Sequence, residues 1–352
     1  MNQRALEFFR KALETPSASG FERPVQQLVR DYAADFADEV RTDVHGNVTV
    51  IKNPDAPLRL MFAGHCDQIG LIVQHIDDEG FVYIQPIGGW DPQILLGQRM
   101  TVWGHEGPVS GVIGKKPIHL LTDEEKKKVP KIKDLWLDVG AANKEEAEGL
   151  VSVGDAVTVA LGMTELPNGR VVSPAMDDKA GMWTVIEAVR RAEKSKLECG
   201  VYAVSTVQEE VGLRGARTSA FGIDPQVGVA VDVTFATDCP TIEKKEEGDI
   251  QLGKGPVIYR GPNMNPKVVA ALIAAADEHE IPFQRAAEGR ATGTDANAIQ
   301  INRAGVATGL VSIPNRYMHS PVEMIALDDI DRAADLLARF AERLTADADF
   351  TP

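Results

Sequence analysis

Apolar residues recur at helical spacing in two stretches between residues 3 and 38, which predicts two helices separated by the sequence TPSASG. The next stretch, EVRTDVHGNVTVIK, predicts a β-hairpin that turns at His45 and Gly46. The run LRLMFAG is then apolar almost throughout, as expected for a buried strand. This strand pattern ends at His65 and Asp67, two polar side chains that could take part in a functional site.

The pattern changes in the middle of the chain. From about Gly70 to Leu166, short alternating segments such as GFVYIQPIGG, RMTVWG and GDAVTVAL are separated by glycine and proline, which is typical of a small antiparallel barrel. The C-terminal half alternates helical and strand patterns, which predicts an α/β fold. We therefore expect a layered α/β domain with a mostly parallel central sheet, formed by residues 1–68 and 167–352 and interrupted by a small β-barrel insertion domain at 69–166.

Length and charge narrow the class of protein. A chain of 352 residues is longer than one hydrophobic core usually supports, which agrees with two domains. The 37 basic and 52 acidic side chains give a net charge of −15, which argues against nucleic acid and membrane as partners. Three cysteines cannot form a disulfide framework, so we expect a reducing compartment, the cytoplasm. We also expect no signal peptide and no membrane span, because no apolar run fits either.

Side chains of the types that bind metals lie next to the predicted strands and helices. Asp177 and Asp178 directly precede a helical pattern. Others follow strand-like apolar runs, and they are His65, Asp67, Glu209, Glu210, Asp232 and His319. Open α/β sheets bind ligands beyond the carboxyl ends of their strands, so we expect these side chains to converge on one crevice. Two histidines with several carboxylates form a nitrogen and oxygen ligand set suited to zinc, cobalt or manganese.

Each of these features also has an ordinary structural explanation. Glu209 and Glu210 fit a solvated strand end, and the acidic pair before the helix fits an N-cap followed by a first-turn acid. Asp232 fits the start of a turn, and His319 fits a surface histidine. Their joint occurrence after successive strands is what favours a metal site.

Longer motifs in the chain resemble those of a known family. They are SGFERPV, AGHCDQIG, IGGWDPQILLGQRMTV, AMDDKAG, QEEVGLRGA, VDVT, GTDANAIQ and SIPNRYMHSP. Together they cover nearly the whole chain and are similar to the motifs of the M42 metallo-aminopeptidases, which include the TET-type and glutamyl aminopeptidases of the dizinc exopeptidase clan. The resemblance implies an enzyme that removes the N-terminal residue from peptides with a free N-terminus. It also implies a homo-oligomer, in which dimers formed through the insertion domain assemble into a dodecamer.

The resemblance further implies a role for each candidate residue. Two divalent metal ions, with zinc favoured over cobalt or manganese, would be bound by Asp177 as the bridge, by His65 and Asp232 on one side, and by Glu210 and His319 on the other. Glu209 would be the general base that activates water, and Asp67 would orient His65. The chain departs from the family pattern at Gln68, where the family usually has glutamate.

Other functions stay open from the residues alone. A related metal-dependent amidohydrolase, such as a carboxypeptidase or a deacylase, would use the same ligand set. A glycoside hydrolase would need only Glu209 and a second carboxylate. A non-catalytic assembly protein would keep the fold with a vestigial site. The sequence does not specify the preferred N-terminal residue, the native metal or the final oligomeric state.

Overall fold

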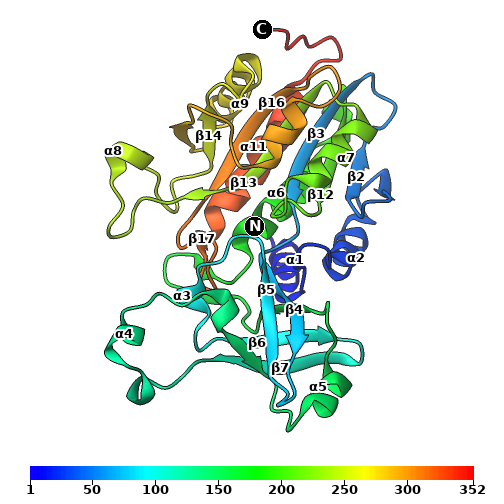
Figure 1. The fold of residues 1–352 in the computed structure, drawn as a ribbon. Helices are drawn as coiled ribbons and strands as arrows, with labels where there is room; N and C mark the ends of the chain where they lie inside the picture. Colours follow the sequence, from blue (N-terminus) through cyan, green and yellow to red (C-terminus); the bar gives the residue numbers. More distant parts are fainter.

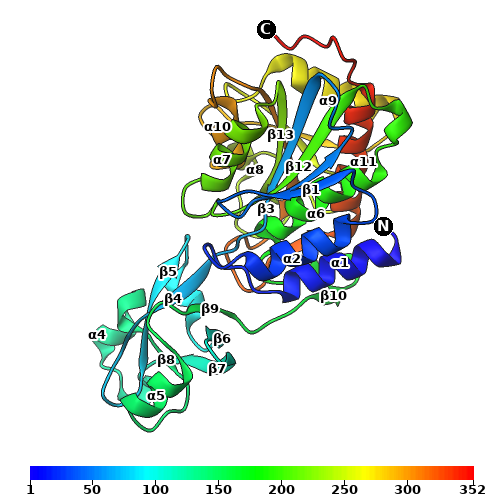
Figure 2. The same cartoon turned by 90° about the vertical axis from the view of Figure 1, so that its right-hand side faces the viewer.

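An eight-stranded sheet lies at the centre of the α/β part of the molecule, and a β-barrel projects from one end of it (Figure 1, Figure 2). The computed structural model describes all 352 residues. The strands of the central sheet are β1 Glu39–Thr42, β2 Val48–Lys52, β3 Leu58–His65, β12 Cys199–Thr206, β13 Val227–Phe235, β14 Val257–Arg260, β15 Gln284–Ala287 and β16 Ala307–Asn315. Their order across the sheet is β1-β2-β12-β3-β13-β16-β14-β15.

The four central strands, β12, β3, β13 and β16, are parallel, so their carboxyl ends meet at one edge of the sheet. The flanking strands run the other way: β2 is antiparallel to β12, and β14 is antiparallel to β16. The predicted hairpin is β1 paired with β2, with Thr42 opposite Val48 and a positive φ at Gly46 in the turn. The predicted α/β class with a mostly parallel central sheet is therefore confirmed.

Helices cover both faces of this sheet (Figure 2). The helices around the sheet are α1 Gln3–Glu14, α2 Arg23–Ala33, α6 Met176–Arg191, α7 Arg214–Ile223, α9 Pro266–Glu278, α10 Asp295–Gln300 and α11 Leu327–Arg343. Helices α6, α9 and α11 pack against one face, and α7 and α10 pack against the other. Alternate strand residues therefore meet different helices: a Cβ atom on Gly309 would touch Val268 of α9, whereas one on Gly228 would touch Ile299 of α10.

The projecting part is a closed barrel with its own apolar core. Its strands, in the order in which they pair, are β4 Gly70–Ile76, β5 Val82–Ile87, β8 Trp136–Asp138, β7 Gly107–Gly114, β6 Arg99–Gly104 and β9 Ala156–Val159. All pairs are antiparallel, which confirms the predicted small antiparallel barrel.

Shorter elements complete the fold. The remaining strands, β10 Thr164–Leu166, β11 Arg170–Val172 and β17 Met324–Ala326, form a small sheet outside the barrel. The short helices are α3 Pro92–Leu95, α4 Asp123–Lys126, α5 Lys144–Leu150 and α8 Lys244–Glu247. None of the helices combines the length and the apolar character that crossing a bilayer requires.

Strand β3 and helix α6 approach each other closely at Gly64, the residue before His65. A Cβ atom at this position would lie 2.5 Å from the carbonyl carbon of Gly181 and 2.6 Å from its oxygen. Both atoms belong to the backbone of the buried helix α6, so they cannot move without shifting the helix. The contact between these two glycines thus sets how closely the end of β3 lies against the start of α6.

We predict that Gly64→Ala lowers the free energy of unfolding by about 3 kcal/mol, because the added methyl group overpacks the contact between β3 and α6. Thermal unfolding followed by circular dichroism measures the loss. Gly149→Ala is the matched control, because this glycine lies in α5 with no atom within 4 Å of an added Cβ. The control should be as stable as the parent or slightly more stable. Equal melting temperatures for the two variants would contradict the close-contact account.

Candidate metal centre

Residues from five segments converge at the carboxyl ends of the parallel strands, where a cleft opens; His65 contacts Asp177 but does not itself line the cleft. The cleft has a volume of about 930 Å³. His65 ends β3, Asp177 lies at the start of α6, and Asp232 lies within β13. Strand β13 continues for three residues beyond Asp232, so this aspartate is part of the strand and does not begin a turn. The loops after β12 and β16 bring Glu210 and His319 to the same cleft.

Asp177 lies between the two histidines. Its Oδ1 atom is 3.1 Å from Nε2 of His65, and its Oδ2 atom is 3.2 Å from Nε2 of His319. A glutamate oxygen lies near each imidazole as well, Glu209 at 3.7 Å from His65 and Glu210 at 3.6 Å from His319. Two groups result whose ligand atoms lie within 4.8 Å of one another: His65, Glu209 and Asp232, and Asp177, Glu210 and His319.

Both imidazoles are held by main-chain carbonyl groups. Nδ1 of His65 is 3.0 Å from the carbonyl oxygen of Asp67, and Nδ1 of His319 is 2.9 Å from that of Gly89. A carbonyl oxygen only accepts, so each Nδ1 atom carries a proton and donates it. Such a hydrogen bond leaves Nε2 to face the acidic cluster, which is the usual arrangement of a metal-binding histidine. Gly89 belongs to the segment after β5, so the barrel part of the chain helps to hold His319 in place.

The carboxylate of Asp67 binds the turn that carries the two glutamates. Its Oδ1 atom accepts the main-chain N–H of Glu209 at 3.0 Å, and Oδ2 accepts that of Glu210 at 3.2 Å. Oδ2 also accepts the hydroxyl of Ser19 at 2.6 Å. Oδ1 lies 3.5 Å from Nδ1 of His65, farther than the carbonyl oxygen of the same aspartate. Asp67 therefore contacts His65 chiefly through its main chain and the glutamate turn through its side chain.

Two further buried acids hold the main chain of the metal-facing residues. Glu323 accepts the N–H of Asp177 at 3.1 Å and that of His319 at 2.7 Å. Asp178 accepts the N–H of His65 at 3.3 Å. Sequence reasoning missed Glu323, because a lone glutamate in SPVEM carries no signal beyond its position four residues after the histidine. The sequence indicates Asp178 only as an acid at the start of a helix, whereas in the structure its carboxylate accepts the N–H of His65 at the end of β3.

The two adjacent glutamates lie in a turn that breaks the strand. Strand β12 ends at Thr206, Gln208 has a φ of 55°, and Gly212 has a φ of 122° that favours glycine. The N–H of Gly212 donates to the carbonyl oxygen of Glu209 at 2.8 Å and closes the turn. Because the chain is not extended here, Glu209 and Glu210 both face the cleft.

Burial dominates the electrostatics of the cleft. It raises the pKa of Glu210 to about 8, with repulsion from Asp177 adding to the effect. Burial, together with neighbouring acids, also raises the pKa of Glu209 and of Asp232 above their usual range. The hydrogen bond with Asp177 raises the pKa of His319 to about 9. Several acids that are costly to ionise together therefore face one space, and a cation in that space would favour their charged forms.

The donor set fits divalent metal ions. Oε1 of Glu210 is buried and has no hydrogen-bond partner, although an ionised carboxylate seeks several. Both histidines direct Nε2 toward the acids, and the candidate ligands are all nitrogen and oxygen atoms. Such a set suits zinc, cobalt or manganese. Cys66, the nearest thiol in the sequence, is buried in the hydrophobic core, as expected for a packing residue.

Gln68 points away from the cleft. Its Oε1 atom accepts from Nζ of the buried Lys179 at 2.7 Å, and the same Nζ donates to the carbonyl oxygen of Thr15 at 2.7 Å. Gln68 belongs to neither group of candidate ligands. Glutamine in place of the family's usual glutamate therefore gives the buried Lys179 a neutral hydrogen-bond partner. The replacement removes no candidate ligand atom.

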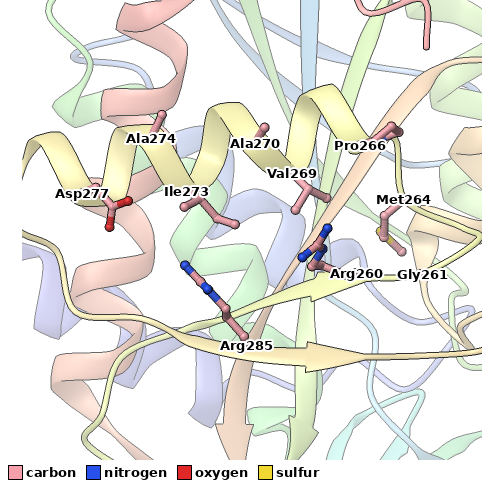
Figure 3. A pocket seen from close by; sticks show the side chains of 10 residues that line it. All are labelled: Arg260, Gly261, Met264, Pro266, Val269, Ala270, Ile273, Ala274, Asp277 and Arg285. Atoms are coloured by element: carbon pink, nitrogen blue, oxygen red, sulfur yellow. The ribbon is translucent and has the colours of Figure 1, made fainter.

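A second cavity of about 520 Å³ lies between α9 and the strands β14 and β15 (Figure 3). Val269 and Ile273 of α9 form part of one wall, and Arg260 and Arg285 of the two strands face them (Figure 3). Its one acidic lining residue is Asp277, and no histidine or cysteine lines it. This cavity therefore offers too few ligand atoms for a metal site.

Comparison with known proteins identifies the family. The sequence profile described as M42 glutamyl aminopeptidase matches residues 46–336. The chain belongs to the M42 glutamyl aminopeptidase family. It is 42% identical to lysyl aminopeptidase from Pyrococcus furiosus over 98% of this chain and 99% of that protein.

Solved structures of TET aminopeptidases have the same fold. The TET aminopeptidase of the marine sediment archaeon Thaumarchaeota archaeon SCGC AB-539-E09 has a TM-score of 0.92 and 37% identity, covering 97% of each chain. The TET1 peptidase of Pyrococcus horikoshii, described as able to assemble into a tetrahedron or a large octahedral shell, has a TM-score of 0.86 and 32% identity, covering 97% of this chain and all of that one. This M42 protein is therefore a hydrolase of the aminopeptidase class, which confirms the resemblance. The family match favours this activity over a non-catalytic assembly protein.

We predict that the metal-free protein loses thermal stability as the pH rises from 6.5 to about 9. His319 has a raised pKa, so its contribution is complete below its ordinary value of 6.5 and disappears as the pH passes about 9. Glu210 acts in the same direction, because a carboxyl with a raised pKa is disfavoured once it ionises. Zinc binding needs deprotonated ligands, so zinc should stabilise the protein increasingly over the same range.

Melting temperatures of chelator-treated and zinc-supplemented protein, measured across this pH range, test the prediction. Asp177→Asn is the control, because it removes the main cause of the raised histidine pKa and should flatten the metal-free curve. A metal-free melting temperature that rises over this range would show that the sign is wrong.

Proposed function

We propose that the protein is a co-catalytic dimetal aminopeptidase that hydrolyses the N-terminal residue from peptides. The observation that carries the proposal is the position of Asp177, whose two oxygens lie 3.1 Å and 3.2 Å from the imidazoles of His65 and His319. A carboxylate with one oxygen toward each of two ligand groups is suited to bridge two cations. Zinc is the first choice for this ligand set, with cobalt or manganese as alternatives.

The other ligands divide between two sides of this carboxylate. The residues that would hold the ions with Asp177 are His65 and Asp232 on one side, and Glu210 and His319 on the other. When bound, a metal pair lowers the pKa of a water molecule and polarises the carbonyl group of the scissile bond. The protein's own contribution is to fix the ligands through main-chain hydrogen bonds and to hold a carboxylate beside them.

Glu209 is the general base of the proposed mechanism. Its carboxylate takes the proton of the attacking water and passes it to the amine that leaves. Burial supports this role, because a carboxylate with a raised pKa is a stronger base than an exposed one and accepts the proton of water more readily. A substrate that binds with its free α-amine beside this acidic cluster would be cut only at its first peptide bond, which would distinguish this activity from that of a carboxypeptidase or a deacylase.

We predict that Glu209→Gln keeps two metal ions and lowers the rate about 10²- to 10⁴-fold, because an amide cannot accept the proton. Glu210→Gln should instead lose one ion and recover part of its activity when excess metal is supplied. The two substitutions are matched in shape, and the carboxylates lie at similar distances, 3.7 Å and 3.6 Å, from the nearer imidazole. Metal content and cleavage of free and N-acetylated peptides are measured on both variants.

The two outcomes that contradict this assignment are distinct. Loss of metal in Glu209→Gln but not in Glu210→Gln would exchange the roles of the two glutamates. Cleavage of N-acetylated peptides as fast as free ones would reject the aminopeptidase mechanism in favour of another amidohydrolase.

We also propose that residues 69–166 act as a separate assembly domain, through which dimers form and build a dodecamer. The barrel projects from the α/β part and has its own core, which supports a separate role (Figure 1). The relative from Pyrococcus horikoshii is described as assembling into closed shells, which supports a large assembly here.

We predict that replacing residues 72–156 by a short glycine linker yields a smaller particle in light scattering. The chain ends left behind are Leu71 and Val157, which lie opposite each other on antiparallel strands, so about two or three residues close the gap. Circular dichroism confirms that the α/β part remains folded. An oligomer with an unchanged number of subunits would contradict the role of the barrel in assembly.

A further inference from the structure

The segment between α1 and α2, residues 15–22, lies along the loop that follows His65. The N–H of Gln68 donates to the carbonyl oxygen of Ser17 at 3.0 Å, and the hydroxyl of Ser17 donates to that of Cys66 at 2.7 Å. Ala18 pairs with Gln68 as in a parallel sheet. The break between two helices, TPSASG in the sequence, is therefore an ordered strand-like segment beside the metal centre.

This segment is held from the other side by the barrel and by the glutamate turn. Ala18 is buried in a small apolar cluster with Ile87 and Ala156 of the barrel, and Val211 of the turn packs against the same cluster. Ala18 packs closely against Gly70, because a Cβ atom added to Gly70 would lie 2.7 Å from the Cβ atom of Ala18. The segment thus has little freedom to move relative to the loop that it contacts.

Two side chains of the segment reach the hydrogen bonds that hold the glutamate turn. Ser19, which is 7% exposed, donates to the fully buried Asp67 at 2.6 Å. Asp67 in turn accepts the main-chain N–H groups of Glu209 and Glu210. Glu22 accepts the N–H of Gln208, the residue before the pair, at 3.2 Å. The turn is therefore held at three consecutive N–H groups by carboxylates that the segment either supplies or orients.

We propose that Ser19 is a positioning residue for the reaction, because its hydroxyl holds the Asp67 carboxylate in the orientation that accepts both N–H groups of the glutamate turn. This inference rests on the proposed role of Glu209 as general base. Without the hydroxyl, Oδ2 of Asp67 loses one of its donors in a buried environment, and the carboxylate is free to rotate. The turn then shifts, and displacement of a catalytic group by a fraction of an ångström lowers the rate of the chemical step.

The test compares Ser19→Ala with Ser17→Ala in the full-length, metal-loaded protein. The two serines are buried and lie on the same segment, but the hydroxyl of Ser17 donates to the carbonyl oxygen of Cys66, lies 3.3 Å from Oε1 of Gln68, and has no hydrogen bond to Asp67. For Ser19→Ala we expect kcat to fall about tenfold, with KM and metal content close to those of the parent. Ser19→Thr, which keeps a hydroxyl, should recover most of the lost kcat.

The control separates positioning from stability. Ser17→Ala should lower the melting temperature at least as much as Ser19→Ala, yet keep the kcat of the parent. Equal kcat values for the two alanine variants would overturn the proposal, as would loss of metal in Ser19→Ala or failure of the threonine variant to recover. A parent protein that releases no N-terminal residue from peptides would reject the proposed function itself, whereas an active parent with an unaffected Ser19→Ala variant rejects only the role of Ser19.

Discussion

The burial of several carboxylates in one small cleft is the constraint on which the rest of this structure depends. Glu209 and Asp232 are 8% and 6% exposed, and the side chain of Glu210 is 6% exposed. Burial raises the pKa of each of them, which means that their charged forms are costly without a compensating cation. Bound metal ions would stabilise the ionised carboxylates and so compensate for this cost, and the geometry of the candidate ligands fits such ions.

A second set of buried acids holds the main chain of the segments that carry the candidate ligands. Asp67, Asp178 and Glu323 do not belong to the two ligand groups, and each accepts main-chain N–H groups from the segments that carry the ligands. Hydrogen bonds of this kind stabilise charged carboxylates and fix the main chain at the same time. The ligands come from segments far apart in the sequence, so these bonds also tie the carboxyl edge of the sheet together. The end of β3, the start of α6 and the loop after β16 are all joined in this way.

Sequence patterns predicted much of this arrangement. Hydrophobic periodicity separates the α/β part from the barrel, and His65 and His319 were recognisable because polar ligand types follow apolar strands. The features that could not be predicted are contacts through main-chain atoms or single polar residues. Gly89 contributes only a carbonyl oxygen from the barrel, and the partners of Glu323 depend on how two distant loops meet. Asp67 is predicted to orient His65, and its carboxylate lies 3.5 Å from that imidazole; its hydrogen bonds to the glutamate turn are a contact that the sequence did not indicate.

The central claim is that Asp177 bridges two metal ions, and anomalous X-ray scattering from crystals of the zinc-loaded protein tests it most directly. We predict two anomalous peaks about 3.5 to 4 Å apart, one beside His65 and Asp232 and the other beside Glu210 and His319, with the Asp177 carboxylate between them. A single peak, or two peaks of which only one contacts Asp177, would contradict it.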